Sequence, residues 1–321
     1  MLVVVAPGQG SQTPGFLTPW LGLPHARERL AWLSAVTDLD LTRYGTTAAA
    51  DEIRETSVAQ PLLVGSGLLA AEALFGHLGD APQCVGAIAG HSVGEVTAAA
   101  IARAMSPETA MVFVRERGRA MAEAAAVHDG GMTAILGGDP DTVHTKLDAL
   151  GITAANSNGA GQIVAAGTME QLESLVADPP TRTRLRPLAV AGAFHTSHMK
   201  PAVEALRRLA PGVPMADPAA PLLSNRDGTV IDRGDAVLDR MVCQVSAPVR
   251  WDLCMRTMGD MGMSALIELP PAGTLVGLAR RALPGVETVA LKTPADLDAA
   301  RALVATHAPA VTQHTPQWRL L

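Results

Sequence analysis

The chain contains few charged and few aromatic residues. Only 17% of its 321 residues are charged and 3% are aromatic, whereas 48% are apolar. This composition excludes a disordered chain and a coiled coil, because both are rich in charge. The net charge of -6 and the scarcity of stacking side chains also give no footprint for nucleic acid. The core must therefore be built from Ala, Leu, Val and Met.

Cysteine is scarce as well. Cys84, Cys243 and Cys254 show no CxxC spacing and are odd in number, which argues against a disulfide framework or a zinc site and indicates a reducing compartment. Targeting and membrane segments also look absent: no basic leader precedes the first apolar run, and the stretch 61–74 is short for a bilayer span and carries Glu72. We expect a cytoplasmic protein without membrane contact.

Apolar strand-like runs alternate with helical segments along most of the chain. Residues 2–6 and 85–89 are short apolar runs, typical of strands buried on both faces. Helices are expected to begin at Gln60-Pro61 and at Ser106-Pro107, where a capping serine precedes a proline. A further helix is expected over residues 93–104. The same alternation resumes at 265–282. It predicts an α/β fold with a mostly parallel sheet.

The rhythm changes between residues 127 and 194. The expected elements are, in order, strand 131–137, helix 140–150, strands 152–156 and 163–166, helix 168–177 and strand 185–190. This order is that of a split βαβ unit, a ferredoxin-like subdomain. Because 321 residues are too many for one ordinary core, we predict a catalytic domain of residues 1–126 and 195–321 with 127–194 inserted. The tail from Ala305 is expected to be loosely ordered.

Gly90-His91-Ser92-Val93-Gly94 is a G-x-S-x-G pentapeptide between an expected strand and an expected helix. Glycines permit the strained turn that leaves a serine hydroxyl clear of the backbone. The N-terminus of the following helix would favour an oxyanion beside that serine. We interpret Ser92 as a nucleophile. The alternative is a glycine-rich turn with an incidental serine.

A serine nucleophile needs a base. His91 is expected to point away from the serine because of the turn, and six other histidines lie in polar surroundings. His195 and His198 remain, just after the last strand of the insertion, and the residues alone leave both open. A metal half-site is disfavoured because no Asp, Glu or Cys lies near this pair. No acidic third member of a triad stands out.

Arg117 falls within the apolar stripe of the helix that starts at Pro107. A guanidinium on such a face needs an anion, and its planar fork fits a carboxylate. We interpret Arg117 as a receptor for a substrate carboxylate; the alternative is a snorkelling or internally paired arginine.

The loop that begins Gly8-Gln9-Gly10 carries Thr13 where a dinucleotide site needs its third glycine. It could instead offer an N–H to an oxyanion.

Together these motifs resemble the malonyl-CoA:acyl carrier protein transacylases of fatty-acid synthesis and the acyltransferase domains of polyketide synthases. The resemblance follows the family's order from residue 3 to about 280, and so covers nearly the whole chain. The matching stretches are Pro7-Gly8-Gln9-Gly10-Ser11-Gln12, Gln60-Pro61, Gly90-His91-Ser92-Val93-Gly94-Glu95, Arg117-Gly118, Ala193-Phe194-His195 with Met199-Lys200-Pro201, Pro248-Val249-Arg250-Trp251, and Glu268-Leu269 to Gly273.

The resemblance implies an α/β-hydrolase-like domain with a ferredoxin-like insertion. It also implies transfer of malonyl from malonyl-CoA to the phosphopantetheine thiol of an acyl carrier protein, by a ping-pong mechanism through a malonyl-serine. Ser92 would be the nucleophile, His195 rather than His198 its base, and Arg117 the clamp on the malonyl carboxylate. No cofactor or metal is implied. We expect a monomer that serves fatty-acid or polyketide synthesis.

Further roles follow from the same resemblance. The main-chain N–H groups of Gln9 and Val93 would form an oxyanion hole. Main-chain carbonyls near Arg250 would orient the histidine. Three more side chains are expected to contact the substrate, with Phe194 favouring malonyl over methylmalonyl: Phe194, His91 and Gln60.

A basic patch is expected to bind the acidic carrier. Arg182, Arg184 and Arg186 alternate along the last strand of the insertion, so period-two spacing would place them on one face, near the cleft mouth. The alternative is that the three arginines merely solvate a small sheet.

Two other functions compete with the transferase. A carboxylesterase or lipase uses the same turn, but it would lack a buried Arg117 and would carry an acid between serine and histidine in chain order. A non-catalytic binding protein on this scaffold is disfavoured by the presence of Ser92, His195 and Arg117.

Overall fold

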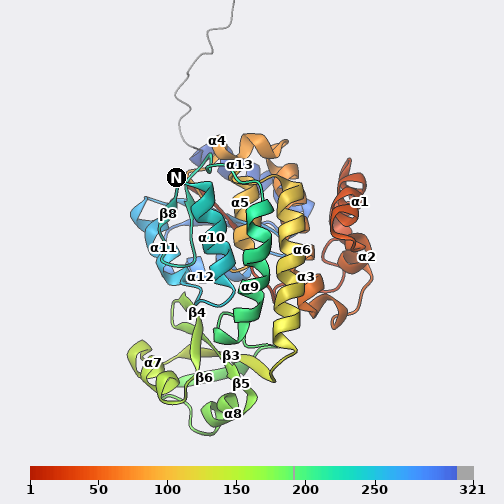
Figure 1. The fold of residues 1–321 in the computed structure, drawn as a ribbon. Helices are drawn as coiled ribbons and strands as arrows, with labels where there is room; N and C mark the ends of the chain where they lie inside the picture. The colour runs from red at the N-terminus through yellow and green to blue at the C-terminus, as the bar shows by residue number, and fades with distance from the viewer. Residues whose placement is uncertain (191, 309–321) are drawn as a thin grey trace, which may run out of the picture.

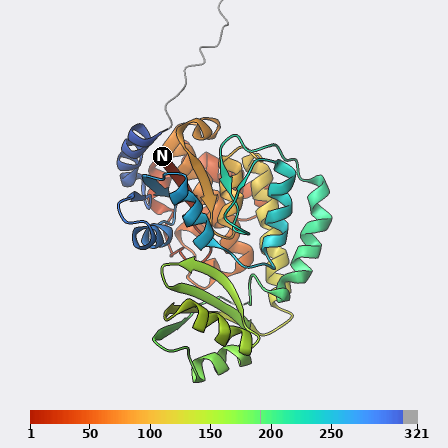
Figure 2. The ribbon, with the colours of Figure 1, turned by 90° about the vertical axis from the view of Figure 1, so that its left-hand side faces the viewer.

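Two β-sheets organise the molecule. The structure is a computed structural model and describes residues 1–190 and 192–308. A six-stranded sheet lies in the larger part, and a four-stranded sheet with two helices forms the smaller part, seen below it in Figures 1 and 2. The fold is therefore mixed α/β, as the alternation of apolar runs predicted.

The larger sheet is mostly parallel. Its spatial order is β10-β9-β1-β2-β7-β8, and β8 alone runs antiparallel to its neighbour. The first strand of the chain therefore lies in the interior of the sheet, between β9 and β2. The strands are β1 (Leu2–Ala6), β2 (Ala87–Gly90), β7 (Leu222–Leu223), β8 (Val230–Ile231), β9 (Ala265–Glu268) and β10 (Glu287–Ala290).

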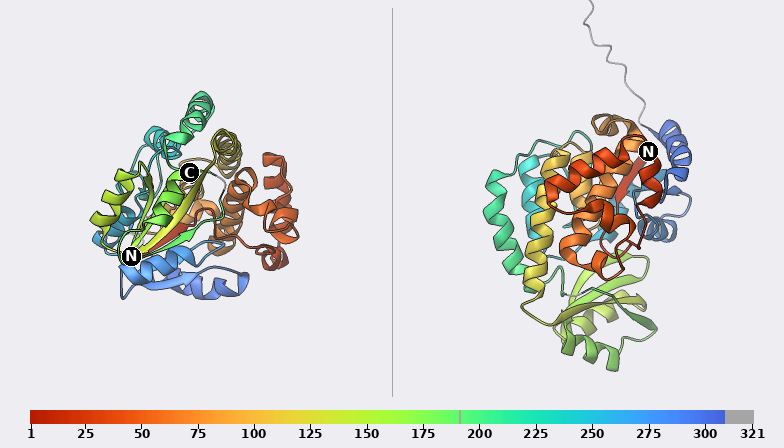
Figure 3. Two further views of the ribbon diagram at one scale, coloured as in Figure 1. Left: turned by 90° about the horizontal axis from the view of Figure 1, so that it is seen from below. Right: turned by 90° about the vertical axis from the view of Figure 1, so that its right-hand side faces the viewer.

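Helices cover both faces of this sheet. Side chains alternate along β1, so Leu2 and Val4 enter one apolar cluster while Val3 and Val5 enter another. Helices α11 and α12 pack on the second cluster, and the remaining helices of the larger part pack on the first (Figure 3). These helices are α1 (Ala26–Thr37), α2 (Leu41–Thr46), α3 (Thr56–Phe75), α4 (Ala81–Cys84), α5 (Gly94–Ile101), α6 (Pro107–Ala125), α9 (Lys200–Leu209), α10 (Gly234–Gln244), α11 (Trp251–Asp260), α12 (Thr274–Ala282) and α13 (Leu297–His307).

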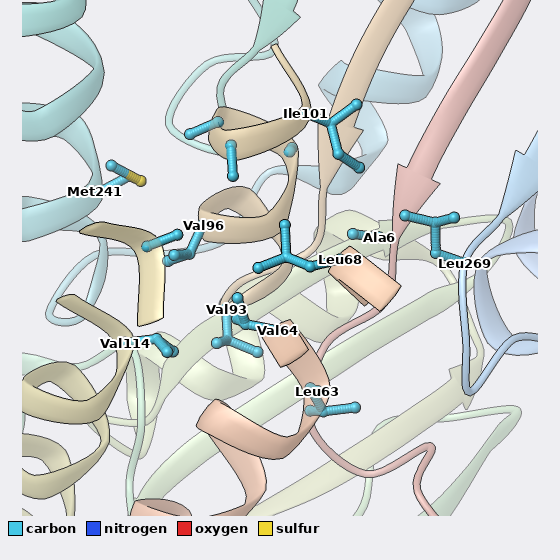
Figure 4. Packing of buried hydrophobic residues seen from close by; sticks show 14 of the residues in the cluster. Ala6, Leu63, Val64, Leu68, Val93, Val96, Ile101, Val114, Met241 and Leu269 are labelled. Carbon is cyan, nitrogen blue, oxygen red and sulfur yellow. The ribbon is translucent and has the colours of Figure 1, made fainter. Parts of the chain in front are cut away.

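Helix α3 is an apolar helix of the core. Its length and composition would suit a membrane span, but 83% of its most apolar window is buried inside the protein. Figure 4 shows Val64 and Leu68 of this helix beside Val93, in the first apolar cluster. The predicted start at Gln60-Pro61 is wrong, because the helix begins at Thr56 and Pro61 lies inside it. Tertiary packing of a buried helix here outweighs the hydrogen bond that proline cannot donate.

The carboxyl ends of the parallel strands meet at one edge of the larger sheet. The loop 7–13 follows β1, the turn 91–93 follows β2, the segment 224–228 follows β7 and the segment 269–273 follows β9. Strands that share a direction place their following segments side by side, and ligands of open α/β sheets bind at this edge. The edge also faces the smaller sheet (Figure 2).

The smaller sheet is antiparallel, in the order β4-β5-β3-β6. One face packs on α7 and α8, and the other contributes Met132 and Ala134 to the main apolar cluster. The elements follow the predicted strand-helix-strand-strand-helix-strand order: β3 (Gly130–Gly137), α7 (Pro140–Ala149), β4 (Thr153–Gly159), β5 (Gln162–Thr168), α8 (Met169–Ala177) and β6 (Thr183–Pro187).

Further predicted boundaries differ from the structure. The domain division and the class of the larger domain remain predictions. The last strand of the small sheet ends at Pro187, earlier than the predicted 185–190. Helix α13 continues through Ala305 to His307, so the predicted loose tail is helical there, and residues 309–321 lie outside the described residues. The division into 1–126 with 195–321 and an inserted 127–194 stays a prediction, as does the α/β-hydrolase-like class.

The turn after β2 depends on glycine at position 94. A Cβ built there would lie 2.2 Å from the carbonyl oxygen of Ala6, a main-chain atom that side-chain rotation cannot move. We expect Gly94→Ala to lower the free energy of unfolding by about 2–3 kcal/mol, measured by urea denaturation. Gly22→Ala is the control, because no heavy atom lies within 4 Å of a Cβ there. Equal stability of the two variants would contradict this account of the turn.

Candidate active site

Ser92 lies in the tight turn that joins β2 to α5. Its φ of +52° is left-handed, a conformation that costs about 1–3 kcal/mol for a residue other than glycine. The chain can turn so closely only because Gly90 has no side chain, since a Cβ there would lie 1.9 Å from the carbonyl carbon of Gly94. The serine hydroxyl thereby stands beside the N-terminus of α5.

His195 is the histidine that contacts Ser92. The Nε2 atom of His195 lies 2.8 Å from Ser92 Oγ. His195 is buried and also has a left-handed φ, +61°. His198 is only half-buried, and its ring packs edge-on against His128, with ring centroids 5.4 Å apart. The pair of histidines that the residues left open is thus distinguished by geometry.

The other nitrogen of His195 contacts a main-chain carbonyl. Nδ1 lies 2.8 Å from the carbonyl oxygen of Gln244, at the end of α10. A hydrogen bond from Nδ1–H to this oxygen leaves Nε2 free to accept a proton from the serine. The assignment to Arg250 is therefore corrected, because the orienting carbonyl belongs to Gln244, six residues earlier in the chain. The Arg250 side chain instead pairs with Asp252 at 2.9 and 2.8 Å. Every residue has a carbonyl, so the sequence offered no signal for this one.

Arg117 is buried without an acidic partner. It is 1% exposed, and its guanidinium donates to Gln60 Oε1 at 2.6 Å and to Gln244 Oε1 at 2.8 Å. Its Nη2 also lies 3.4 Å from Ser92 Oγ. Burial lowers the pKa of Arg117 to about 10, partly opposed by the charge of Glu95, so the group stays charged at neutral pH. A cation held by neutral oxygens next to a serine can receive a carboxylate.

Gln9 and His91 border the same turn. The Gln9 side chain donates to the Arg54 carbonyl at 3.1 Å, which fixes the loop after β1. His91 points away from Ser92, as predicted, and its Nε2 lies 2.8 Å from Asn158 Oδ1 on β4. Burial lowers the pKa of His91. His91 therefore connects the turn to the smaller sheet.

The main-chain N–H groups of Gln9 and Val93 come from the two loops beside Ser92. Among the described residues, neither donates a hydrogen bond to another protein group. Both N–H groups are thus available to an oxyanion. Phe194 is 5% exposed and directly precedes His195.

A cleft of about 430 Å³ lies between the two sheets beside this turn. Amide side chains and the glycine-rich loop supply most of its polar lining, and Arg54 is the one lining residue with a formal charge, His91 being neutral. The side-chain oxygen of Asn156, which also lines it, is buried and has no hydrogen-bond partner within the described residues. The amide-bearing lining residues are Gln9, Gln12, Asn156, Asn158 and Gln162.

Only two of the three arginines in the predicted basic patch follow the alternation of strand β6. Arg184 and Arg186 are exposed and lie on one face of β6, opposite the face of Leu185, which packs toward α7 and α8. Arg182 precedes the strand and has a left-handed φ of +58°. Period-two spacing therefore does not place Arg182 on that face, which corrects the prediction for one of the three. Carrier docking by this patch stays a prediction.

No metal centre accompanies the serine. Within residues 1–190 and 192–308, no group of three or more His, Cys, Asp or Glu side chains is arranged to hold a metal ion.

Comparison with known proteins identifies the family. The model of the acyl transferase domain matches residues 3–313. The chain belongs to the acyl transferase domain family. It is 49% identical over 303 residues to a malonyl CoA-acyl carrier protein transacylase of Mycobacterium tuberculosis, covering 93% of this chain and 98% of the relative. The resemblance seen in the sequence motifs is thereby confirmed.

Solved structures of this family agree with the fold. The crystal structure of MCAT from Mycobacterium tuberculosis superposes with a TM-score of 0.90 at 48% identity, covering 94% of this chain and 99% of that one. A second acyl transferase, described as the malonyl-transacylase of a type II PKS acyl-carrier protein and solved in complex with it, gives a TM-score of 0.87 at 27% identity. It covers 94% of this chain and 99% of that one.

Burial of His195 should appear in the pH dependence of stability. Burial and the charge of Arg117 lower the pKa of His195 to about 3, so below about pH 6.5 the unfolded state binds a proton that the folded state does not. The contribution of this residue to the free energy of unfolding therefore decreases as the pH is lowered. Between pH 7 and pH 5, we expect wild type to lose about 2 kcal/mol relative to His195→Ala, measured by urea denaturation at both pH values.

The matched control for this measurement is His198→Ala. Its unfolding free energy is measured at the same two pH values, to show what the loss of a half-buried histidine from the same segment does. A difference between wild type and His195→Ala that does not change with pH would contradict the assignment of His195 as a buried, neutral imidazole.

Proposed function

We propose that this acyl transferase moves a malonyl group from malonyl-CoA to the phosphopantetheine thiol of an acyl carrier protein. The observation that carries the proposal is Arg117, a buried cation 3.4 Å from Ser92 Oγ and without an acidic partner. An acyl group that bears its own carboxylate would neutralise this cation while its thioester carbonyl lies at the serine. The names of the M. tuberculosis relative and of the carrier complex support the same substrates.

The proposed reaction has two half-reactions through one covalent intermediate. In the first, His195 Nε2 takes the proton of Ser92 as Oγ attacks the thioester carbonyl, and the N–H groups of Gln9 and Val93 stabilise the oxyanion. The C–S bond then breaks, and the imidazolium returns the proton to the coenzyme A thiolate. In the second, the carrier thiol gives its proton to the same nitrogen and its sulfur attacks the carbonyl of malonyl-Ser92. The ester C–O bond then breaks, and the imidazolium returns the proton to Ser92 Oγ.

The carbonyl of Gln244 suits the second role of His195. It orients the imidazole and accepts a hydrogen bond from Nδ1–H, and it stabilises the imidazolium with a dipole in place of a full negative charge. Malonyl is itself an anion, so a buried carboxylate at this position would repel it. A neutral acceptor is the better partner for a base that works beside an anionic substrate.

The competing functions fit the site less well. A carboxylesterase or lipase acts on neutral acyl groups, which would leave the Arg117 charge without an anion, at a cost of about 3–5 kcal/mol. A non-catalytic binding protein would not require Ser92 and His195 at 2.8 Å in two strained backbone conformations.

We also infer that the cleft between the sheets receives the pantetheine arm, whose amides match the amide side chains of its lining. Phe194 would then exclude a methyl branch at the malonyl α-carbon. A methyl group changes specificity by only about 1–3 kcal/mol, so discrimination against methylmalonyl should be partial. A carrier of fatty-acid or of polyketide synthesis presents the same thiol to this site.

Covalent labelling tests the nucleophile and the base. Wild type should take up one malonyl group from malonyl-CoA and release it rapidly to a carrier thiol and slowly to water. Ser92→Ala should not be labelled, and His195→Ala should be labelled roughly 10²–10⁴-fold more slowly, the usual effect of losing a general base. Rapid mixing with radiolabelled malonyl-CoA measures the rate.

His198→Ala provides the matched control, because it removes a histidine three residues away from the same segment. It should be labelled at nearly the wild-type rate. If His198→Ala proves the slow variant and His195→Ala the fast one, the base has been misassigned.

Arg117 should set the choice between malonyl and acetyl. Because an unpaired buried charge costs about 3–5 kcal/mol, wild type should prefer malonyl-CoA by roughly 10²–10³-fold in kcat/KM. Arg117→Ala should abolish most of this preference, mainly by losing malonyl transfer. Arg119→Ala is the control, since Arg119 is an exposed arginine of the same helix. An unchanged malonyl/acetyl ratio in Arg117→Ala would rule out the clamp.

A further inference from the structure

A buried carboxyl group lies close to Ser92, and the reaction above does not use it. Glu95 belongs to the first turn of α5 and is 6% exposed. Its Oε1 accepts the main-chain N–H of Asn225, and its Oε2 accepts a hydrogen bond of 2.5 Å from Gln244 Nε2. One carboxylate therefore joins three segments that are distant in sequence: the start of α5, the loop after β7 and the end of α10.

Asn225 carries the first of these contacts to the nucleophile. It is fully buried, and its Oδ1 accepts the main-chain N–H of Ser92 at 2.7 Å. Its Nδ2 donates to the carbonyl of Gly90 at 2.7 Å. Asn225 thus holds the turn at the end of β2 and at the strained residue itself. A serine with a left-handed φ relies on such contacts to keep its backbone in place.

Gln244 carries the second contact to the rest of the site. Its carbonyl binds His195 Nδ1 at 2.8 Å, and its Oε1 binds Arg117 at 2.8 Å. Its Nε2, which donates to Glu95, also lies 3.2 Å from the carbonyl oxygen of Ser92. A shift of Gln244 would therefore move three contacts at once: the carbonyl that binds His195, the amide oxygen that binds Arg117, and the amide nitrogen beside the Ser92 carbonyl.

We propose that Glu95 is a positioning residue, which sets the relative placement of Ser92 and His195 through Asn225 and Gln244. Both groups that face its oxygens are N–H donors, so both oxygens must accept. Burial raises the pKa of Glu95 to about 8, and the N–H of Asn225 opposes this shift by favouring the ionised form. An ionised carboxylate accepts both hydrogen bonds, whereas a glutamine would direct an amide N–H against one of the two donors. The charged groups nearest to it, Arg117, Arg240 and Asp227, act on it through space and donate no hydrogen bond to it among the described residues.

The test is the reactivity of Ser92 in Glu95→Gln, which keeps the size of the side chain. The rate constant for labelling by a fluorophosphonate should fall roughly 10–100-fold, since a small misplacement of reacting groups costs about this much. This reagent needs Ser92 and His195 but not malonyl-CoA. With malonyl-CoA, kcat should fall by a similar factor while KM changes less than about threefold, because Glu95 touches no substrate.

Glu268→Gln is the matched control. Glu268 is also fully buried at the carboxyl edge of the sheet, and it accepts main-chain N–H groups of Gly273, Leu275 and Val276. None of its hydrogen-bond partners touches Ser92 or His195. This variant should therefore lose stability without slowing fluorophosphonate labelling of the folded protein. Equal slowing in both variants would show a general effect of losing a buried carboxylate and would overturn the proposal.

Wild-type labelling of folded Glu95→Gln would also overturn it. If that variant does not fold, Asn225→Asp decides the question, because it keeps the acceptor for Ser92 N–H and loses the donor to Gly90. It should be labelled at least about tenfold more slowly, and an unchanged rate would reject the chain of contacts. The kinetic part with malonyl-CoA depends on the proposed function. Wild type that labels with the fluorophosphonate but not with malonyl-CoA would reject that function and leave the positioning test intact.

Discussion

The charge of Arg117 has to be kept in the interior of the protein without an acid beside it. Its guanidinium is 1% exposed and bonds to two amide oxygens and the hydroxyl of Ser92. Much of the surrounding structure follows from this constraint. A carboxylate partner for His195 would neutralise the cation, and His195 instead contacts the Gln244 carbonyl. The buried carboxyl group of Glu95 is separated from Arg117 by the side chain of Gln244.

The edge of the parallel sheet supplies the parts of this arrangement from distant places in the chain. Ser92 follows β2, Gln9 follows β1 and Asn225 follows β7. His195 lies in the segment between β6 and α9, and Gln244 is the last residue of α10. Ser92 and His195 both have a left-handed φ, and their side chains meet. Strain at these positions is held by the packing and hydrogen bonds of the elements around them.

Features with local causes could be predicted from the sequence. The buried strand of residues 2–6, the capped start of α6 at Pro107 and the G-x-S-x-G turn depend on neighbouring residues, and each is present. Arg117 was found because a charged residue interrupts an apolar stripe. The start of α3 was misplaced, since local rules put proline in a first turn, whereas tertiary packing decides where this helix begins.

Features that depend on tertiary contacts could not be predicted from neighbouring residues. Gln244 acts through a carbonyl that has no signature in the sequence, and Asn225 is brought to Ser92 only by the pairing of β7 with β2. Arg182 fits the alternation by spacing, but it precedes the strand to which the alternation applies. The residues alone left His195 and His198 open as well; the resemblance to the family pointed to His195, and the coordinates place it against Ser92.

The position of β1 within its sheet has a consequence for synthesis of the chain. Its neighbour β2 is available once residue 90 has been made, but its other neighbour, β9, ends at Glu268. At about 5–20 residues per second, translation of the intervening stretch takes on the order of tens of seconds. Throughout that time an apolar strand edge has no partner, and such edges pair with other chains. A nascent polypeptide of this topology is therefore open to strand pairing with other chains for longer than one whose first strand lies at a sheet edge.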